Sequence, residues 1–212
     1  MNYIVEIKQI LAQARQKSYQ AINSAMVEAY WLIGKRIVEE EQNGKERADY
    51  GKEIIKNISE EMTKEFGKGF SERTLREFRQ FHLTFPKLIE NQLNIDENSK
   101  QNIWRTVFAK LSWSHFQRVL RVPSADARIY YLKEAASQNW SIRTLDRNIS
   151  TLYYQRLLSS PQKESVENEM LEKTKDFQNN PYEFIKNPTV LEFLNLKKNW
   201  QTKLKNKNTY LS

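Results

Sequence analysis

The chain has 212 residues, a formal net charge of +8, only 5 Gly and 5 Pro, and no Cys. So few turn-forming residues exclude an all-β sandwich or barrel, and an aromatic content of 12% excludes a disordered chain. The lack of Cys excludes disulfides, iron–sulfur clusters and thiolate zinc sites, and His82 and His115 are too few for a His-based metal site.

The N-terminal part of the sequence predicts four helices. Apolar residues at Ile4, Ile7 and Leu11 predict a short first helix, and a stripe from Ile22 to Ile37 predicts a longer one over about residues 17–42. The segment 50–66 predicts a third amphipathic helix. Gly67 to Gly69 ends it, and a fourth helix is expected from Glu72 to about Phe85, with Ser71 as its N-cap.

The remainder of the chain predicts a loop, one strand and further capped helices. Residues 90–102 are polar and are expected to form a loop. Residues 103–108 are the best candidate for a strand, with a helix as the alternative. Ser112 or Ser114, Ser124 and Ser141 are expected to cap helices that end near Leu120, at Ser137 and near Leu158. A linker at 159–161, a charged helix over 163–177 and a basic tail follow.

The predicted fold class is therefore mainly α: a helical bundle with a helix-turn-helix or winged-helix-like core over residues 45–158 and at most one short β-hairpin. Residues 1–158 are expected to form the main domain, with a long N-terminal helix packed on the core. Residues 159–196 are expected to contain a linker helix, and residues 197–212 a basic, low-complexity tail.

Positive charge is concentrated in one segment. Residues 100–160 contain 10 Lys and Arg against 3 Asp and Glu, whereas residues 1–99 contain 15 against 16. Trp and Tyr residues are interleaved with these cations. Because Lys and Arg side chains release condensed counterions when they meet phosphates, this composition indicates a polyanion-binding surface. The alternative is a basic helical face that is only solvated.

A short pattern of an aromatic residue followed by Ser-x-Arg-Thr-Leu occurs twice, at residues 70–75 and 140–145. In each copy the Ser is expected to cap a helix, whose outward face is rich in Arg and other hydrogen-bond donors. Such side chains suit phosphates and base edges, and the free N–H groups of each helix start would add affinity for anions. The expected nucleic-acid-binding residues are Lys68, Ser71, Arg73, Thr74, Arg76, Gln80, Ser141, Arg143, Arg147 and Tyr154.

Catalytic and cofactor motifs are not found in the sequence. It has no phosphate-binding loop, no dinucleotide-binding glycine pattern and no His-Glu-x-x-His zinc motif. No catalytic residue, metal or cofactor is therefore expected, and the chain is not expected to be an enzyme. His82 and His115 are expected to pack or to form hydrogen bonds. Without an apolar run of membrane-spanning length or a secretory signal, a cytoplasmic location is expected.

The sequence resembles the YhcG family of bacterial proteins, which contain a PD-(D/E)XK nuclease domain. The resemblance covers roughly residues 12–196. It rests on motifs that occur in one order, with Tyr153 and Arg156 between the last two: YWLIG at 30–34, YG at 50–51, FGKGFS at 66–71, LSWSH at 111–115, WSIR at 140–143 and NPTVLEFL at 187–194. The resemblance implies a helical, winged-helix-like DNA-binding domain, followed in the family by a nuclease domain. It also implies that residues 159–196 include the start of that nuclease domain and that the remainder is missing. The nuclease metal ligands have no counterpart here, so none is carried over.

The sequence leaves two candidate functions. The first is a non-catalytic DNA-binding module linked to DNA restriction, defence or processing, with duplex or branched DNA as its partner. The second is a helical scaffold that forms a homodimer or docks a PD-(D/E)XK nuclease subunit. Solvent-exposed Tyr30 or Trp31 would mark the surface of such a scaffold.

Overall fold

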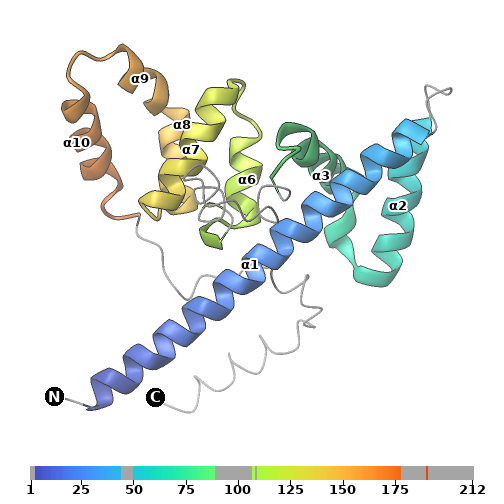
Figure 1. Cartoon of the computed structure of the whole chain (residues 1–212), viewed down its shortest axis with the longest axis horizontal. Coiled ribbons are helices and arrows are strands. Elements are labelled where there is room, and N and C mark those ends of the chain that lie inside the picture. The colour runs from blue at the N-terminus through green and yellow to red at the C-terminus, as the bar shows by residue number, and fades with distance from the viewer. Residues whose placement is uncertain (1–2, 44–49, 89–106, 108, 178–189, 191–212) are drawn as a thin grey trace, which may run out of the picture.

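The computed structural model describes residues 3–43, 50–88, 107, 109–177 and 190, and Figure 1 shows their arrangement. Within these residues the chain is helical and contains no strand, which confirms the mainly α prediction. The α-helices of the described residues are α1 (Tyr3–Asn43), α2 (Tyr50–Phe66), α3 (Glu72–Thr84), α6 (Trp113–Val119), α7 (Ala125–Ser137), α8 (Ile142–Ser150), α9 (Tyr153–Ser159) and α10 (Lys163–Thr174). A short 3₁₀ helix, η1 (Lys68–Phe70), joins α2 to α3.

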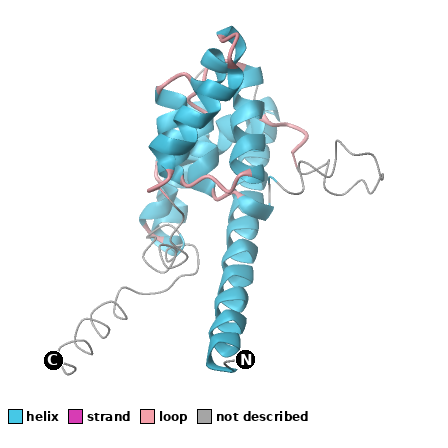
Figure 2. Cartoon of the chain, turned by 90° about the vertical axis from the view of Figure 1, so that its left-hand side faces the viewer, coloured by secondary structure: helices cyan, strands magenta, loops and turns pink. Residues whose placement is uncertain are grey.

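The first helix is one continuous element, and the prediction of two separate helices before residue 43 was wrong. Neither Gly nor Pro occurs between Tyr3 and Ile33, so nothing in the backbone chemistry interrupts α1. The buried side chains of α1 all lie from Asn23 onward, whereas every side chain from Tyr3 to Ser18 is exposed. The N-terminal half of α1 accordingly projects beyond the body of the molecule (Figure 2).

The second half of α1 packs with α2 and α3 into a first bundle. Gly34 allows the closest approach, because a Cβ at this position would lie 2.0 Å from the carbonyl oxygen of Phe78 in α3. One turn earlier, Tyr30 stacks on Phe78 with ring centroids 4.2 Å apart. Trp31 is buried, and its indole Nε1–H donates to the Phe85 carbonyl at 2.8 Å. Tyr30 and Trp31 therefore belong to the core, and neither marks an exposed interaction surface.

The helices α6 to α9 form a second bundle, and α10 packs on its outer side. Between α7 and α8 the chain turns within four residues, 138–141. Asn139 adopts a left-handed conformation there with φ of 53°, and the Trp140 N–H donates to the Ala135 carbonyl at 3.0 Å. This short turn brings α8 against both α6 and α7.

An aromatic cluster joins the two bundles into a single core. Trp113, the first residue of α6, lies edge-on to Tyr30, Phe78 and Phe81, with ring centroids 5.2 to 5.3 Å away. The side chain of Gln117 adds a polar link, since its amide donates to the Glu77 carboxylate of α3 at 2.7 Å. The core consequently runs without interruption from α1 through α3 and α6 to α8.

Several helix predictions are confirmed, and a second one is wrong. The helices α2, α3, α6, α7 and α10 begin and end at or near the expected residues. The expected single helix from Ser141 to Leu158 is instead divided into α8 and α9, because Leu152 adopts a left-handed backbone with φ of 51°. At this break 56% of the surface of Leu152 is exposed.

Other predictions lie outside the described residues. They concern the loop at 90–102, the strand at 103–108 apart from Val107, and the tail at 197–212. Val107 itself is helical and buried. No β-hairpin is present in the part of the chain that the structure describes.

Candidate nucleic-acid interface

The two repeated Ser-x-Arg-Thr segments have the same local structure. The Ser71 hydroxyl oxygen accepts from the Thr74 N–H at 3.3 Å, and the Ser141 hydroxyl oxygen accepts from the Thr144 N–H at 3.1 Å. In both segments the Ser and Thr hydroxyls also hydrogen-bond to each other, at 2.9 and 3.0 Å. This geometry confirms that both serines are N-caps, and it engages the Thr74 hydroxyl within its own helix start.

The two caps differ in their surroundings. Ser71 is exposed, whereas Ser141 and Thr144 are buried. A ligand at the surface therefore has direct access to the hydroxyl of Ser71 and little access to that of Ser141. For Ser141 the structure shows a cap that fixes where α8 begins, and with it the position of Arg143 two residues later.

The outward face of α3 carries mixed charge. The guanidinium group of Arg76 contacts Glu72 at 2.5 Å, and that of Arg73 lies 3.5 Å from Glu77. Both arginines stay largely exposed, and pairs of this kind between exposed side chains on one helix contribute little stability. Further along the face, the Gln80 amide donates to the Thr84 hydroxyl at 3.0 Å. The Lys68 side chain lies outside the described part of the chain.

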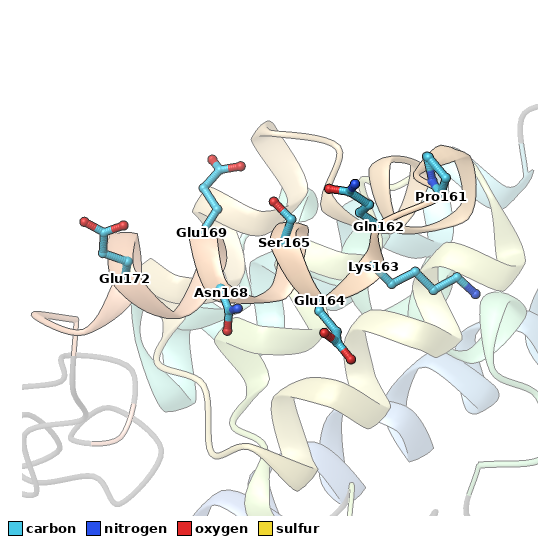
Figure 3. Close-up of a pocket in the computed structure, with 8 residues that line it drawn as sticks. All are labelled: Pro161, Gln162, Lys163, Glu164, Ser165, Asn168, Glu169 and Glu172. Atoms are coloured by element: carbon cyan, nitrogen blue, oxygen red, sulfur yellow. The ribbon is translucent and has the colours of Figure 1, made fainter.

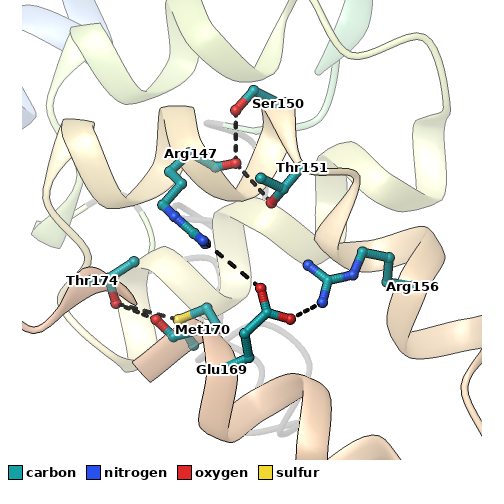
Figure 4. A network of polar contacts seen from close by, with 7 residues as sticks. All are labelled: Arg147, Ser150, Thr151, Arg156, Glu169, Met170 and Thr174. Atoms are coloured by element: carbon teal, nitrogen blue, oxygen red, sulfur yellow. Dashed lines mark hydrogen bonds and ion pairs between the residues drawn. The ribbon is translucent and has the colours of Figure 1, made fainter. Parts of the chain in front are cut away.

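On α8, the predicted residues have different environments. Arg143 is exposed and has no carboxylate partner among the described residues. Arg147 is more covered, with 23% of its side-chain surface exposed, and it faces Glu169 of α10 at 3.9 Å. Arg156 of α9 pairs with the other oxygen of the same carboxylate (Figure 4). Glu169 thus holds two arginines and covers part of the outward side of α8.

Tyr154 belongs to an aromatic cluster on α7 and α9. Its ring lies 4.9 Å from that of Tyr130 and 6.5 Å from that of Tyr131, and it is half-buried. Burial raises the pKa of Tyr130, Tyr131 and Tyr153 above the ordinary tyrosine value, so these phenols stay protonated at neutral pH. The cluster holds α9 against α7.

The predicted residues do not form one continuous surface. α3 packs with α1, α2 and η1 in the first bundle, whereas α8 packs with α6, α7 and α9 in the second. In Figure 1, α6 lies between α3 and the overlapping helices α7 and α8. Arg73 and Arg76 therefore lie on one bundle and Arg143 and Arg147 on the other.

On the second bundle the structure shows exposed cations that lie outside the repeated pattern. Lys110, Arg121 and Lys133 are exposed on the second bundle. Arg118 of α6 contacts Asp146 of α8 at 3.2 Å, so α6 and α8 lie side by side. The concentration of positive charge between residues 100 and 160 was the signal for these residues, since none of them lies in a repeated motif.

His115 connects the starts of α6 and α8 inside this bundle. Its Nδ1 accepts from the Ser112 N–H at 3.2 Å, so its Nε2–H donates to the Trp140 carbonyl at 3.1 Å. Burial disfavours the charged ring and lowers the pKa of His115 from 6.5 to about 4. The expectation that His115 forms hydrogen bonds is confirmed.

The remaining features of the described residues give little support for a catalytic or metal-binding site. A groove of about 860 Å³ runs along the start of α10, and all of its lining residues come from residues 161–172, so no second element closes it (Figure 3). No cluster of three His, Asp or Glu side chains that could hold a metal occurs in the described segments. None of the described helices is both long and apolar enough to cross a membrane.

Comparisons with known proteins identify the family. Residues 6–156 match the model of the DUF1016 N-terminal domain. The chain is 36% identical over 206 residues to a protein of Escherichia coli (strain K12) named "Putative nuclease YhcG". This match covers 89% of the chain and 54% of the relative, so the chain spans about half the length of the relative it matches. No solved structure matches the chain. The matched residues run from α1 into α9. Because this match covers most of its length, the chain belongs to the DUF1016 N-terminal domain family.

Proposed function

We propose that the chain is a DNA-binding module without catalytic activity of its own and that α8 is its main contact element. Three helices, α6, α7 and α8, pack on one another, and a turn of four residues separates α7 from α8. This is the arrangement that a helix-turn-helix unit requires, with the second helix of the pair presented to the major groove.

The observation that carries the proposal is the position of Arg143. It is exposed at the start of α8, and the buried Ser141 cap fixes that helix start. The segment that contains this bundle, residues 100–160, has 10 Lys and Arg against 3 Asp and Glu. An exposed arginine on a rigid, basic three-helix unit is suited to a phosphate or to a guanine edge.

The relative adds support from its name. A nuclease acts on nucleic acid, and the chain matches about half of a protein named as a putative nuclease. In this proposal the second half of that protein supplies any cleavage, whereas the domain described here holds DNA. A link to DNA restriction, defence or processing belongs to the same proposal, as does a cytoplasmic location.

The proposal is tested by fluorescence anisotropy of labelled duplex DNA titrated with the full chain at 50 and 200 mM salt. Binding is expected to weaken steeply with salt, and Arg143→Ala is expected to lower the slope of log K against log salt by about 0.9. Lys56→Ala is the matched control, because Lys56 is an exposed cation on α2, in the other bundle. The proposal is wrong if DNA affinity does not depend on salt, or if both variants lose affinity equally.

A scaffold function is the second candidate, and a specific observation favours it. Although Tyr30 and Trp31 are buried, the N-terminal half of α1 exposes six large apolar side chains, each with 47% to 69% of its surface accessible. These are Tyr3, Ile4, Val5, Ile7, Ile10 and Leu11. Exposed apolar residues gathered along one helix indicate an interaction surface.

A further inference from the structure

Three of the exposed apolar residues of α1, Ile4, Ile7 and Leu11, lie on the side of the helix that faces away from the body. An α-helix turns by about 100° per residue, so Ile4, Ile7 and Leu11 lie within about 40° of one line along the axis. The buried residues Val27 and Tyr30 lie on a line about 140° away on the same scale. The other helices pack on the side of α1 that carries Val27 and Tyr30. The core that they form therefore does not cover the side that carries Ile4, Ile7 and Leu11.

Along the same side of α1, several of the residues that follow Leu11 are small. Exposed Ala14, Ser18, Ala21 and Ala25 continue it toward the middle of α1. Small side chains at this spacing let a second helix approach closely. The apolar surface therefore continues from the projecting half of α1 toward the body.

At the other end of α1, on nearly the same side of the helix, the structure contains an apolar groove. It has a volume of about 450 Å³ and lies between α1 and α2. Its floor is formed by Ile33, Ile37, Ile54, Ile58, Met62, Phe70 and Leu75, and its rim by Arg36, Glu40, Glu53 and Asn57. On the rim, the charges of Arg36 and Glu40 offset each other, because the two side chains are paired at 2.7 Å. The carboxylate of Glu53 therefore gives the rim a net negative charge.

The charges of the projecting segment are opposite to those of this rim. Residues 3–18 contain three cations, Lys8, Arg15 and Lys17, against Glu6 alone. A basic, apolar helix segment and an apolar groove with an acidic rim are complementary. They lie at opposite ends of the same helix, so one copy of the chain cannot bring its own two surfaces together.

We propose that two copies of the chain pair through antiparallel α1 helices, with the projecting half of each α1 lying over the α1–α2 groove of the other. Aligning residues 4–12 with residues 33–41 places the two-fold axis near Ile22. In this register Lys17 lies opposite Glu28 of the second copy, on the same side of the helix pair. By symmetry that contact occurs twice.

The size of the contact is sufficient for a specific interface. Pairing over residues 4–40 at 1.5 Å per residue gives a contact about 54 Å long, and with a helix diameter of ~10 Å the two copies bury on the order of 1,000 Å². This value is at the lower end of specific interfaces. The dimer is therefore expected to dissociate on dilution.

The test is sedimentation of the full chain between 1 and 100 µM without DNA, so its outcome is separate from that of the DNA-binding proposal. We expect a concentration-dependent dimer. Ile7→Asp should weaken it by at least about tenfold, since each dimer would bury two unpaired carboxylates. Ile7 lies in a fully exposed helix segment, so the fold does not depend on it. Leu171→Asp on α10 is the matched control at another exposed apolar residue and should leave the dimer intact.

Charge reversal and cross-linking test the register. Lys17→Glu and Glu28→Lys should each weaken the dimer, and the two changes together should restore it. Because the chain has no Cys, Ala21→Cys should cross-link to itself with a short bismaleimide, whereas Ala14→Cys, farther from the two-fold axis, should not.

Three results would overturn the proposal: a chain that stays monomeric at 100 µM, a dimer that Ile7→Asp leaves intact, or self-cross-linking of Ala14→Cys in preference to Ala21→Cys. If the chain is monomeric, hydrogen exchange distinguishes the remaining occupants of this face. Protected amides in residues 3–18 would assign it to another segment of the same chain, and rapid exchange would assign it to a different protein.

Discussion

The imidazole of His115 donates its Nε2–H to the backbone carbonyl of Trp140 at 3.1 Å, and this bond ties the start of α6 to the residue before the Ser141 cap. The other ring nitrogen accepts from the N–H of Ser112, which caps α6. The bond from the Ser112 N–H forms only when the ring is neutral, because the Nδ1 of an imidazolium carries a proton and cannot accept it. The alignment of α6 and α8 therefore depends on the protonation state of one buried side chain.

Acidification is expected to destabilise the fold in a defined range. The pKa of His115 falls from 6.5 to about 4 on folding, chiefly because burial disfavours the charged ring. Below pH 6.5 the unfolded chain takes up a proton that the folded chain does not bind until about pH 4. The contribution of His115 to the free energy of unfolding is thus complete above pH 6.5 and decreases as the pH falls, by about 1.4 kcal/mol per unit in this range.

Urea unfolding at pH 7 and pH 5 measures this effect, with His115→Gln as the comparison. The variant is expected to be less stable than the parent at pH 7 by about 1–3 kcal/mol, because buried hydrogen bonds are lost. It should also lose less stability between pH 7 and pH 5. Equal losses in the two proteins would show that other groups cause the acid sensitivity.

Gly34 is expected to be intolerant of even the smallest side chain. A Cβ there would lie 2.0 Å from a backbone oxygen of α3, and a packed backbone cannot move away as a flexible side chain can. Gly34→Ala should therefore lower the free energy of unfolding by about 1–3 kcal/mol. Gly51→Ala is the control, since its Cβ would meet only the flexible Glu41 side chain at 3.2 Å. Thermal unfolding should show a loss for the first variant and little change or a small gain for the second.

Removal of the two serine caps is expected to have unequal effects. Each Ser→Ala change leaves a helix N–H unsatisfied, at a typical cost of about 1 kcal/mol. At Ser141 the Thr144 hydroxyl also loses its partner in a buried place, whereas at Ser71 water can replace the lost bond. Chemical denaturation should show that Ser141→Ala costs more than Ser71→Ala. Equal costs would contradict this reading of the two environments.

Much of the fold was predictable because its signals are local. Serine before an amphipathic run located the starts of α3, α7 and α8, and apolar spacing located α2. The division between α8 and α9 was not predictable, because a distant side chain stabilises it. The Tyr131 hydroxyl donates to the Asn148 carbonyl at 3.1 Å and accepts from the Tyr154 N–H at 3.2 Å, which satisfies two backbone groups at the break. No Gly or Pro marks this position in the sequence.

The candidate site was predictable only as a set of residue types. The sequence indicated arginines on the outward faces of two capped helices, and the helix starts place Arg73 and Arg143 as expected. It could not indicate that the two helices belong to different bundles, since that depends on how α6 packs between them. Nor could it indicate that Glu169, more than twenty residues after Arg147, would pair with that arginine.

Neutralising Glu169 is expected to strengthen DNA binding if α8 is the contact element. Its carboxylate pairs with Arg147 and Arg156, so Glu169→Gln releases both cations, while buried Met170 continues to hold α10 in place (Figure 4). Each arginine that then reaches a phosphate should steepen the dependence of log K on log salt by about 0.9. Glu172→Gln is the matched control, because Glu172 is an exposed carboxylate one turn further along the same helix. Anisotropy titrations at two salt concentrations compare the variants. An equal gain for both would reflect net charge alone, whereas a gain for Glu169→Gln alone would show that α10 limits access to the outward face of α8.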